Sequence, residues 1–436
     1  MLREVSSIAK NTFVLLILAP MILLLSFTPA TALAAPATED PLINIPAIRQ
    51  IDNNGAMMDP AILNAPEGRY TFVLTPKEDA NQVYVAIPAA ILAGLRIENP
   101  NFLINIEAPF ASYSMPAAIE TVLAGFENDD INLRRNSLRI TLQDRSADKA
   151  LAGSFAKSLP HATAISPLVE IRLELIDSDS HEVLLTIGDL AIETAQWLPV
   201  DGSEFPRYYG VFRYDEIAES FSYVPHKAAY FDDLPYAEVA LAGSGLYVVA
   251  QNQVPFKDLP VNAWYSGSVL KAAAKLLVRG GGDNNFEPQR FVTRAEFTQM
   301  IANALLLPQA NSAPYMDVAV NQWYAEAIAR AYGKGLLERF TDKNFLPVKP
   351  ITREEMAVIL GSVLRICGFT SSAALSHFTD VADMNSDYRQ DIALVFEAGL
   401  MQGVSYDKFD PKGVTTRAQA ATVQIRLLEI LNMIDK

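Results

Sequence analysis

The C-terminal part of this 436-residue chain contains the same phrase three times, and this repetition constrains the fold more than any single motif does. Each copy has a Phe-x-Pro triplet and, eight residues after its phenylalanine, an arginine that follows a threonine. The phenylalanines and arginines of the three copies are Phe286 and Arg294, Phe345 and Arg353, and Phe409 and Arg417. Successive arginines are 59 and 64 residues apart. Self-similarity at a nearly fixed period indicates one structural unit that is stacked several times.

Each copy also carries the signature of a helix N-terminus. In a capping box, a threonine side chain accepts a bond from the backbone three residues on, and a Glu or Gln at that position bonds back to the threonine N–H. The three pairs are Thr293 with Glu296, Thr352 with Glu355, and Thr416 with Gln419. Apolar residues at helical spacing follow every pair, which predicts three helices that begin at these boxes.

A second helix is predicted before each box. An aspartate opens every copy, and an aromatic pair or a single tyrosine then leads into apolar residues at helical spacing. The aspartates are Asp258, Asp317 and Asp380, and the aromatic residues are Trp264-Tyr265, Trp323-Tyr324 and Tyr388. Turn residues join the two helices of each unit. A helical pair of this length cannot bury its apolar face alone, so the three pairs should pack together.

The arginine after each cap is unusual, because the positive end of the helix dipole disfavours a cation there. One interpretation is functional: Arg294, Arg353 and Arg417 present planar forks that bind a carboxylate or phosphate beside the free N–H groups of the helix. The other is structural: each arginine pairs with a neighbouring aspartate, such as Asp258, Asp317 or Asp380, and only holds the repeats together. The residues alone leave both open.

The combination resembles the S-layer homology (SLH) family. The similarity rests on the opening aspartate, the Trp-Tyr pair, the Gly-Leu-x-x-Gly of 399–403, the Phe-x-Pro and the Thr-Arg-Ala-Glu phrase, and it covers roughly residues 253–436. The resemblance implies an all-α trimer of helical repeats with pseudo-threefold symmetry and grooves between adjacent repeats. It also implies that the grooves bind secondary cell wall polysaccharide, often through a pyruvylated amino sugar, and hold an exported protein on the bacterial wall.

The resemblance further implies which residues serve the ligand. Arg294, Arg353 and Arg417 match the arginines that meet the acidic sugar, whereas Asp258, Asp317, Asp380, Trp264 and Trp323 match positions that shape the grooves. The copies depart from the pattern at a few positions. The third copy has Gln419 for Glu and Asp387 for Trp, the second has Arg339 for Gly, and the first has Leu276 for Gly. We therefore expect one or two of the three grooves to bind.

The N-terminus has the features of a secretory signal. Residues 1–34 contain an apolar stretch from Phe13 to Phe27, preceded by basic residues, and a small-x-small cleavage site that ends at Ala34. We expect cleavage after Ala34, so that the membrane takes part only during export; an uncleaved membrane anchor is the alternative. Residues 35–69 are rich in Pro and Ala and are predicted to be a leader or linker.

Residues 70–252 are predicted to form a strand-rich α+β domain of unassigned role, followed by repeats at 253–311, 312–374 and 375–436. Runs of β-branched and aromatic residues between turn signals predict the strands. These lie at Tyr70–Leu74, Val83–Ile87, Phe102–Ile106, Leu138–Leu142, Val169–Ile176, Val183–Ile187 and Leu246–Val249. Helices are predicted at Pro88–Leu95, Pro116–Ala124 and Asp148–Lys157.

Composition limits the functions further. Half of the residues are hydrophobic, which is typical of a globular protein, and the lone cysteine, Cys367, allows no intramolecular disulfide. The net charge of −15 argues against nucleic acid as a partner. It also means that binding to an anionic wall polymer has to be local, through placed arginines.

A search for catalytic chemistry finds no complete set of residues. Ser154 and Lys157 fit Ser-x-x-Lys, but the companion motifs of that acyl-enzyme family are missing from the sequence. The four histidines show no metal-ligand spacing. We therefore predict no catalytic residue, no metal and no cofactor, and a non-enzymatic surface protein. Two alternatives stay open: a wall-anchored hydrolase with its active site in residues 70–250, and a structural protein that forms arrays.

Overall fold

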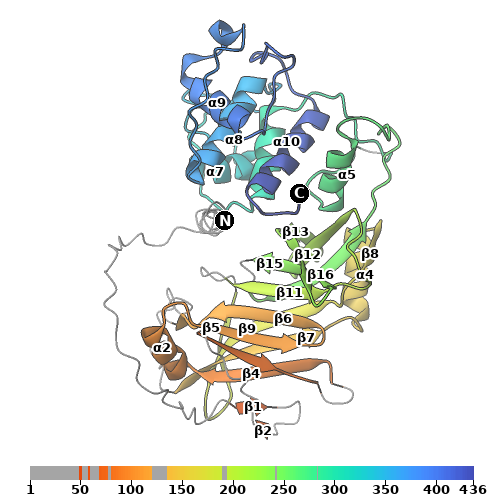
Figure 1. Cartoon of the computed structure of the whole chain (residues 1–436), viewed down its shortest axis with the longest axis vertical. Coiled ribbons are helices and arrows are strands. Elements are labelled where there is room, and N and C mark those ends of the chain that lie inside the picture. The colour runs from red at the N-terminus through yellow and green to blue at the C-terminus, as the bar shows by residue number, and fades with distance from the viewer. Residues whose placement is uncertain are drawn as a thin grey trace.

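The protein has two parts, strand-rich and helical, in that order along the chain (Figure 1). The structure is a computed structural model, and it describes residues 49–51, 57–58, 68–76, 80–119, 135–188, 194–240, 243–281 and 283–436. The predicted signal, residues 1–34, lies outside these ranges, as does most of the predicted leader. No helix in the described ranges has the length and apolar character that crossing a membrane requires.

The larger sheet has ten strands within the described residues, and all its strand pairs are antiparallel. Its path is β13-β12-β16-β9-β7-β4-β1-β2, with β10 beside β9 and β8 beside β16. The strands are β1 (Arg49–Ile51), β2 (Met57–Met58), β4 (Gln82–Pro88), β7 (Asn136–Asp144), β8 (Ala162–Ala164), β9 (Val169–Asp177), β10 (Val183–Ile187), β12 (Tyr209–Asp215), β13 (Ser220–Val224) and β16 (Gly245–Asn252). On β7, the fully buried Leu138, Ile140 and Leu142 alternate with residues of the other face, as the period of a strand requires.

The smaller sheet has six strands in the described residues, in the order β14-β15-β11-β6-β5-β3. The strands are β3 (Arg69–Val73), β5 (Leu103–Ala108), β6 (Ala111–Pro116), β11 (Ala195–Pro199), β14 (Lys227–Phe231) and β15 (Leu234–Ala240). β3 and β5 run parallel, and the other pairs are antiparallel. Side chains of both sheets, such as Ile140 and Ile106, belong to one buried cluster, so the sheets share a core.

The strand-rich part agrees with most of the sequence-based prediction. The seven predicted strands are present as β3, β4, β5, β7, β9, β10 and β16. Two predicted helices correspond to α2 (Ala89–Glu98) and to α4 (Lys149–Ser158), where the Asp148 carboxylate caps the first turn. The third, Pro116–Ala124, runs into residues 120–134, which lie outside the described residues.

The C-terminal part contains two main helices per repeat. The first helices are α5 (Ser266–Ala274), α7 (Ala325–Gly333) and α9 (Arg389–Glu397), the last preceded by the short 3-10 helices η1 (Val381–Asp383) and η2 (Ser386–Tyr388). The second helices are α6 (Arg294–Ala304), α8 (Arg353–Ile366) and α10 (Arg417–Ile430). All three predicted capping boxes are present, with Thr293, Thr352 and Thr416 as the N-caps.

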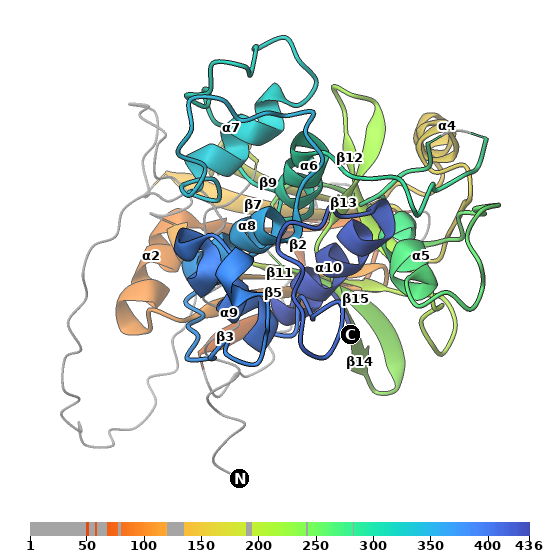
Figure 2. The same ribbon diagram turned by 90° about the horizontal axis from the view of Figure 1, so that it is seen from above.

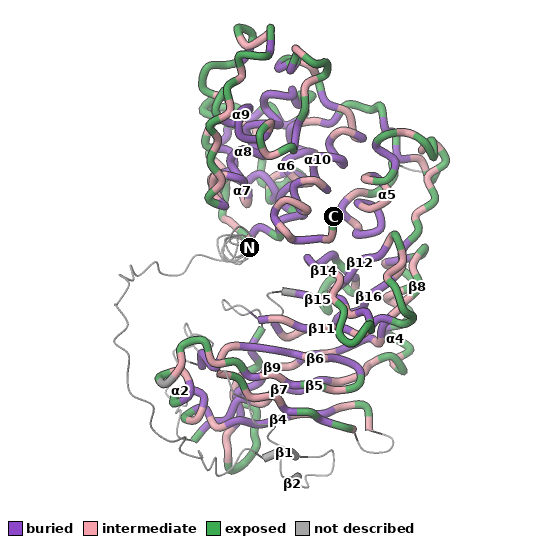
Figure 3. The backbone as a smooth tube through the Cα atoms, viewed as in Figure 1, coloured by how far each residue is buried: buried purple, intermediate pink, exposed green. Residues whose placement is uncertain are grey.

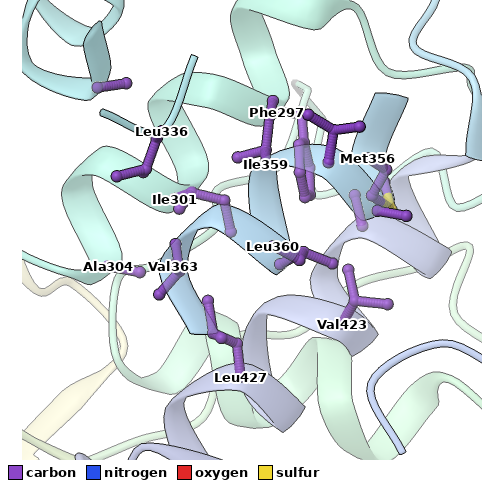
Figure 4. Packing of buried hydrophobic residues seen from close by; sticks show 14 of the residues in the cluster. Phe297, Ile301, Ala304, Leu336, Met356, Ile359, Leu360, Val363, Val423 and Leu427 are labelled. Carbon is purple, nitrogen blue, oxygen red and sulfur yellow. The ribbon is translucent and has the colours of Figure 1, made fainter. Parts of the chain in front are cut away.

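The three repeats pack on one another in a closed cycle. Each second helix packs on the first helix of the following repeat: α6 on α7, α8 on α9, and α10 on α5. Seen from above, α6, α8 and α10 lie at the centre and the first helices surround them (Figure 2). Side chains of the central helices, among them Phe297, Leu360 and Leu427, meet in one core (Figure 4). We call this closed arrangement the helical ring.

The helical ring is attached to the strand-rich part by direct contacts. The His226 N–H, after β13, donates to the Met433 carbonyl near the C-terminus at 3.0 Å. The Asn252 side chain, at the end of β16, donates to the Ala274 carbonyl of α5 at 3.1 Å. Buried residues continue through both parts (Figure 3). Cys367 is buried in the core of the helical ring, and burial raises the pKa of its thiol to about 12, as expected for a packing residue.

Candidate ligand grooves of the helical ring

A closed triangle of backbone hydrogen bonds joins the three repeats just before the capping threonines. The Val292 N–H donates to Thr415 O, the Thr415 N–H to Ile351 O, and the Ile351 N–H to Val292 O, at 2.9 to 3.0 Å. Every repeat therefore donates once and accepts once, and the third closes back on the first. The N-termini of the three central helices are held together at this triangle.

The first N–H groups of each central helix are occupied by the neighbouring repeat. At α6 the N–H groups of Arg294 and Ala295 donate to the carbonyls of Lys349 and Pro347 at 2.9 and 3.0 Å. The equivalent groups of α8 and α10 bond the loops at 411–413 and 288–290 in the same way. The helix N-termini are thus used for assembly, and the hypothesis that their free N–H groups bind an anion is wrong.

The arginine side chains reach the Phe-x-Pro triplet of the following repeat. Arg294 donates to Phe345 O at 2.6 Å, Arg353 to Phe409 O at 2.8 Å, and Arg417 to Phe286 O at 2.9 Å. The guanidinium groups of Arg353 and Arg417 also lie 4.8 Å from the aromatic ring centroids of the same phenylalanines, whereas Arg294 lies 5.2 Å from that of Phe340. Each guanidinium group therefore helps to hold two adjacent repeats together.

The opening aspartates hold the Phe-x-Pro triplets within their own repeats. Both carboxylate oxygens of Asp317 accept backbone N–H bonds of 2.7 Å, one from Phe345 and one from Leu346. Asp258 and Asp380 do the same for the triplets at 286–288 and 409–411. The middle residue of each triplet has a φ between 54° and 60°, which non-glycine residues rarely adopt. The aspartates stabilise this turn and do not pair with the arginines as the structural interpretation required.

Three cavities lie beside the forks, and each combines residues from all three repeats. The cavity of Arg417 has about 470 Å³, that of Arg353 about 310 Å³, and that of Arg294 about 510 Å³. The loop between the helices of the next repeat forms one wall. The remaining repeat adds Trp323 to the Arg417 cavity, Trp264 to the Arg353 cavity, and Asp387 to the Arg294 cavity. The exposed fractions of Trp264 and Trp323 are 65% and 56%.

The family model for the S-layer homology domain matches residues 255–298, 314–357 and 377–421, which are the three repeats of the helical ring. The C-terminal part of the chain consists of three SLH domains. Their second helices are α6, α8 and α10, and the predicted family resemblance is confirmed.

Relatives that share this region are cell-surface proteins and enzymes. The exoglucanase XynX of Acetivibrio thermocellus is 33% identical over 42% of this chain, and the S-layer protein of Bacillus thuringiensis subsp. finitimus is 29% identical over 38%. The amylopullulanase of Thermoanaerobacterium thermosulfurigenes is 26% identical over 70%. The matches span only 16% to 20% of these relatives' own length. The SLH domains and the S-layer relative identify a secreted protein of the bacterial cell surface.

The prediction that this protein is not an enzyme is contradicted by the same relatives. Two of them are named as glycoside hydrolases, an exoglucanase and an amylopullulanase, and they share the SLH region. The prediction relied on the lack of a recognisable catalytic motif. Catalytic carboxylates of glycoside hydrolases come together in space and need no fixed spacing in the sequence, so their absence as a motif is a weak argument.

The three SLH grooves differ in the groups that bond their arginine side chains. The Arg294 guanidinium makes two bonds to the Glu355 carboxylate, of 3.1 and 2.6 Å, and both side chains are nearly buried. Burial alone would raise the pKa of Glu355, but the hydrogen bonds and charge of Arg294 outweigh it and hold this pKa below its usual value. Two arginines that line the same cavity, Arg339 and Arg365, both pair with the fully buried Asp391.

The forks of Arg353 and Arg417 bond carbonyl groups instead. Beyond the phenylalanine carbonyls, Arg353 donates to Gln402 O at 2.6 Å and Arg417 to Arg279 O at 2.8 Å. None of the ion pairs in the described part of the chain includes either fork. Burial lowers the pKa of both guanidinium groups below the usual arginine value.

Two features of the grooves were missed in the sequence. The first is the ion pair between Arg294 and Glu355, since Glu355 was assigned only to a capping box. The second is Arg426, which lines the Arg353 cavity from α10. Helical spacing contains a signal for it: Gln419, Thr422, Val423 and Arg426 follow the i, i+3, i+4, i+7 pattern and share one helix face.

Proposed function

We propose that the helical ring anchors this exported protein non-covalently to the bacterial cell wall by binding an acidic secondary wall polysaccharide in its grooves. A pyruvylated amino sugar of that polymer is the proposed ligand. One observation carries the proposal: each cavity combines an arginine, a loop and a third residue from three different repeats, and in two cavities that third residue is an exposed tryptophan. A sugar has an apolar face for the indole and an acidic group for the guanidinium.

Only an assembled ring creates these grooves, which explains why three copies are present. The cyclic order of helix packing and the closed triangle at Val292, Ile351 and Thr415 support a pseudo-threefold arrangement. In this arrangement the opening aspartates of the three repeats affect ligand binding only indirectly, because they shape the Phe-x-Pro triplets that the arginines contact. These aspartates are Asp258, Asp317 and Asp380.

Sedimentation with purified cell-wall sacculi tests the anchoring. The mature chain should pellet with sacculi that carry the wall polymer and stay in solution when the polymer has been removed. Trp264→Ala together with Trp323→Ala should weaken pelleting without unfolding the ring, because both indoles are largely exposed. A chain truncated after Asn252 should not pellet. Pelleting of the truncated chain, or of the full chain with stripped sacculi, would refute anchoring by the ring.

A second candidate function concerns the strand-rich part. The amylopullulanase match covers 308 residues, more than the SLH domains occupy, so it extends into the strand-rich part. We propose a wall-anchored glycoside hydrolase as the alternative to a purely structural surface protein. Incubation of the full chain with pullulan, starch, xylan and cellulose, followed by measurement of reducing ends, tests it. Release of no reducing ends from any of the four would count against this candidate.

A further inference from the structure

We infer that the groove of Arg353 is the primary anion site of the helical ring, with Arg426 as its second cation, and that in the Arg294 groove the guanidinium is already occupied by the protein's own Glu355. This inference rests on the proposed function, since it names the place where the acidic group of the wall polymer binds. It also gives a consequence for ligand binding to several positions at which one copy departs from the shared pattern of the repeat.

The first argument compares one position in three surroundings. The third residue of each central helix is the Glu or Gln of its capping box. In the closed order of the repeats, it faces the arginine of the preceding repeat. Beside Arg294 this residue is Glu355, which forms a two-bonded ion pair with the fork. Beside Arg353 it is Gln419, which carries no charge. Only the Arg353 fork therefore faces a neutral residue at this position.

The Arg417 groove is intermediate. Its capping-box residue is Glu296, but in the described structure this carboxylate accepts bonds of 2.7 and 3.3 Å from Arg290 and not from the fork. Glu296 nevertheless lines the cavity, and its negative charge offsets part of the positive charge of Arg417 and Arg279. An anion is attracted there less strongly than by a groove without a carboxylate.

The second argument is the charge of the complete linings. The cavity of Arg353 is lined by two arginines, Arg353 and Arg426, and by no Asp or Glu. The cavity of Arg294 has three arginines and three acidic residues, and two of those arginines also share an ion pair with the buried Asp391. In a protein with a net charge of −15, an acid-free concave surface with two guanidinium groups is a local exception that favours an anion.

An unpartnered polar group in the same groove is independent support. Thr415 lines the Arg353 cavity, its exposed fraction is 1%, and its hydroxyl has no hydrogen-bond partner among the described residues. Leaving a buried hydroxyl unpaired is unfavourable, because it has lost its bonds to water without gaining a partner. A ligand oxygen in the groove would satisfy it, while Trp264 offers an apolar face at the entrance.

Calorimetric titration of the full mature chain with a synthetic pyruvylated amino sugar tests the inference, and the same sugar without the pyruvyl group is the second probe. Arg426→Gln should weaken binding of the pyruvylated sugar roughly tenfold or more, because a charge-assisted contact is lost. Gln419→Glu should weaken it at least as much, since it places beside Arg353 a carboxylate equivalent to Glu355, which pairs with Arg294. Glutamate is already the capping residue in the other two boxes, so this variant retains its box.

Asp387→Asn is the matched control. Asp387 is exposed in the Arg294 groove, where the other grooves have tryptophan, and its substitution should leave the affinity unchanged. Unchanged affinity in both Arg426→Gln and Gln419→Glu would overturn the inference, as would a loss confined to Asp387→Asn or equal binding of the sugar without pyruvate. If the wild-type chain pellets with sacculi while these variants bind normally, only this inference fails. If the wild-type chain does not pellet, the anchoring itself fails.

Discussion

The junction between the first two SLH domains and the joint between the helical ring and the strand-rich part both remove a basic side chain from water, but in different ways. At the junction, the Arg294 guanidinium forms an ion pair of 2.6 Å with the Glu355 carboxylate. At the joint, the ammonium nitrogen of Lys275 lies 2.6 Å from the His226 Nε2 and 3.1 Å from the Tyr209 carbonyl, with no carboxylate bonded to it in the described structure. A guanidinium that cannot lose its proton needs a partner, whereas an amine can become neutral.

The surroundings of Lys275 favour the neutral amine. Its exposed fraction is 2%, and burial lowers its pKa to about 7, with Lys271 acting in the same direction and Asp435 and Glu429 opposing it. His226 stays neutral, because burial lowers the pKa of its imidazole well below the usual value. The His226 Nδ1–H then donates to Val224 O at 2.7 Å, and Nε2 accepts from Lys275.

The largest predicted effect is a pH dependence of this joint. The pKa of Lys275 is about 7 in the folded protein and 10.5 when unfolded, so the folded state binds fewer protons between these values. The free energy of unfolding should therefore rise from pH 7 towards pH 10.5, by roughly 4 kcal/mol in all, and level off below pH 7, where both states bind the proton.

Urea unfolding at pH 7, 8 and 9 measures this slope. Lys275→Met replaces the amine with an apolar chain of similar length and should flatten the dependence while keeping the fold. Lys149→Met, at an exposed lysine of α4, should leave the slope in place. A wild-type stability that does not change over this range would show that the amine keeps its proton in the joint.

The ion pair at the junction should give the next largest effect. Glu355→Gln leaves the nearly buried Arg294 without its counter-charge and should reduce the free energy of unfolding of the helical ring by roughly 3 kcal/mol. Because the pKa of Glu355 is lowered in the fold, its contribution is present above about pH 4.5 and is lost as the pH falls through the folded value. Thermal unfolding from pH 3 to 7 measures both effects.

Glu296→Gln is the control for that prediction. Glu296 occupies the same position of its own capping box, but its partner Arg290 is well exposed, so the loss should stay below about 1 kcal/mol. Equal losses in the two variants would mean that the Arg294 junction gains nothing from its burial, and the contrast with Lys275 would disappear.

The aspartates that hold the Phe-x-Pro triplets should have a smaller effect. Asp317→Ala deprives the Phe345 and Leu346 N–H groups of their acceptors and leaves the unusual backbone of Leu346 unsupported, which should cost roughly 2 kcal/mol. Asp342→Ala, in an exposed loop of the same repeat, should change the stability little. Chemical unfolding of the full chain compares the two, and equal stability would show that the triplets hold their shape without the aspartate.

The two parts of the molecule also differ in how far the sequence predicts them. Helix starts in the ring follow from local chemistry, and the capping boxes at Thr293, Thr352 and Thr416 are where they were predicted. Strands such as β6 and β14 were missed. Their sequences, Ala-Ser-Tyr-Ser-Met-Pro and Lys-Ala-Ala-Tyr-Phe, have no β-branched residues, and pairing with distant strands decides their conformation.

The grooves were predictable only in part, for a similar reason. The arginines and tryptophans were found as repeated residues, yet their neighbours depend on the closed order of the repeats. Arg339 and Asp387 were noted as departures in two different repeats, and the fold brings both to the Arg294 groove. The partnership of Arg294 with Glu355 likewise joins residues 61 positions apart, and no periodicity within one repeat indicates it.

The smallest predicted effect compares one glycine from each part of the molecule. Gly399, after α9, has a φ of 75° with open space around a built Cβ, so Gly399→Ala should cost about 1 kcal/mol through backbone strain alone. Gly153 lies inside α4, also with open space, and Gly153→Ala should stabilise by up to about 1 kcal/mol. Thermal unfolding should therefore give opposite signs. Leu276 occupies the position of Gly399 in the first repeat with a φ of 58°. Its side chain packs against a buried apolar cluster that includes Leu151 of α4 and Phe221 of β13, and this packing offsets a strain that alanine at 399 would leave uncompensated.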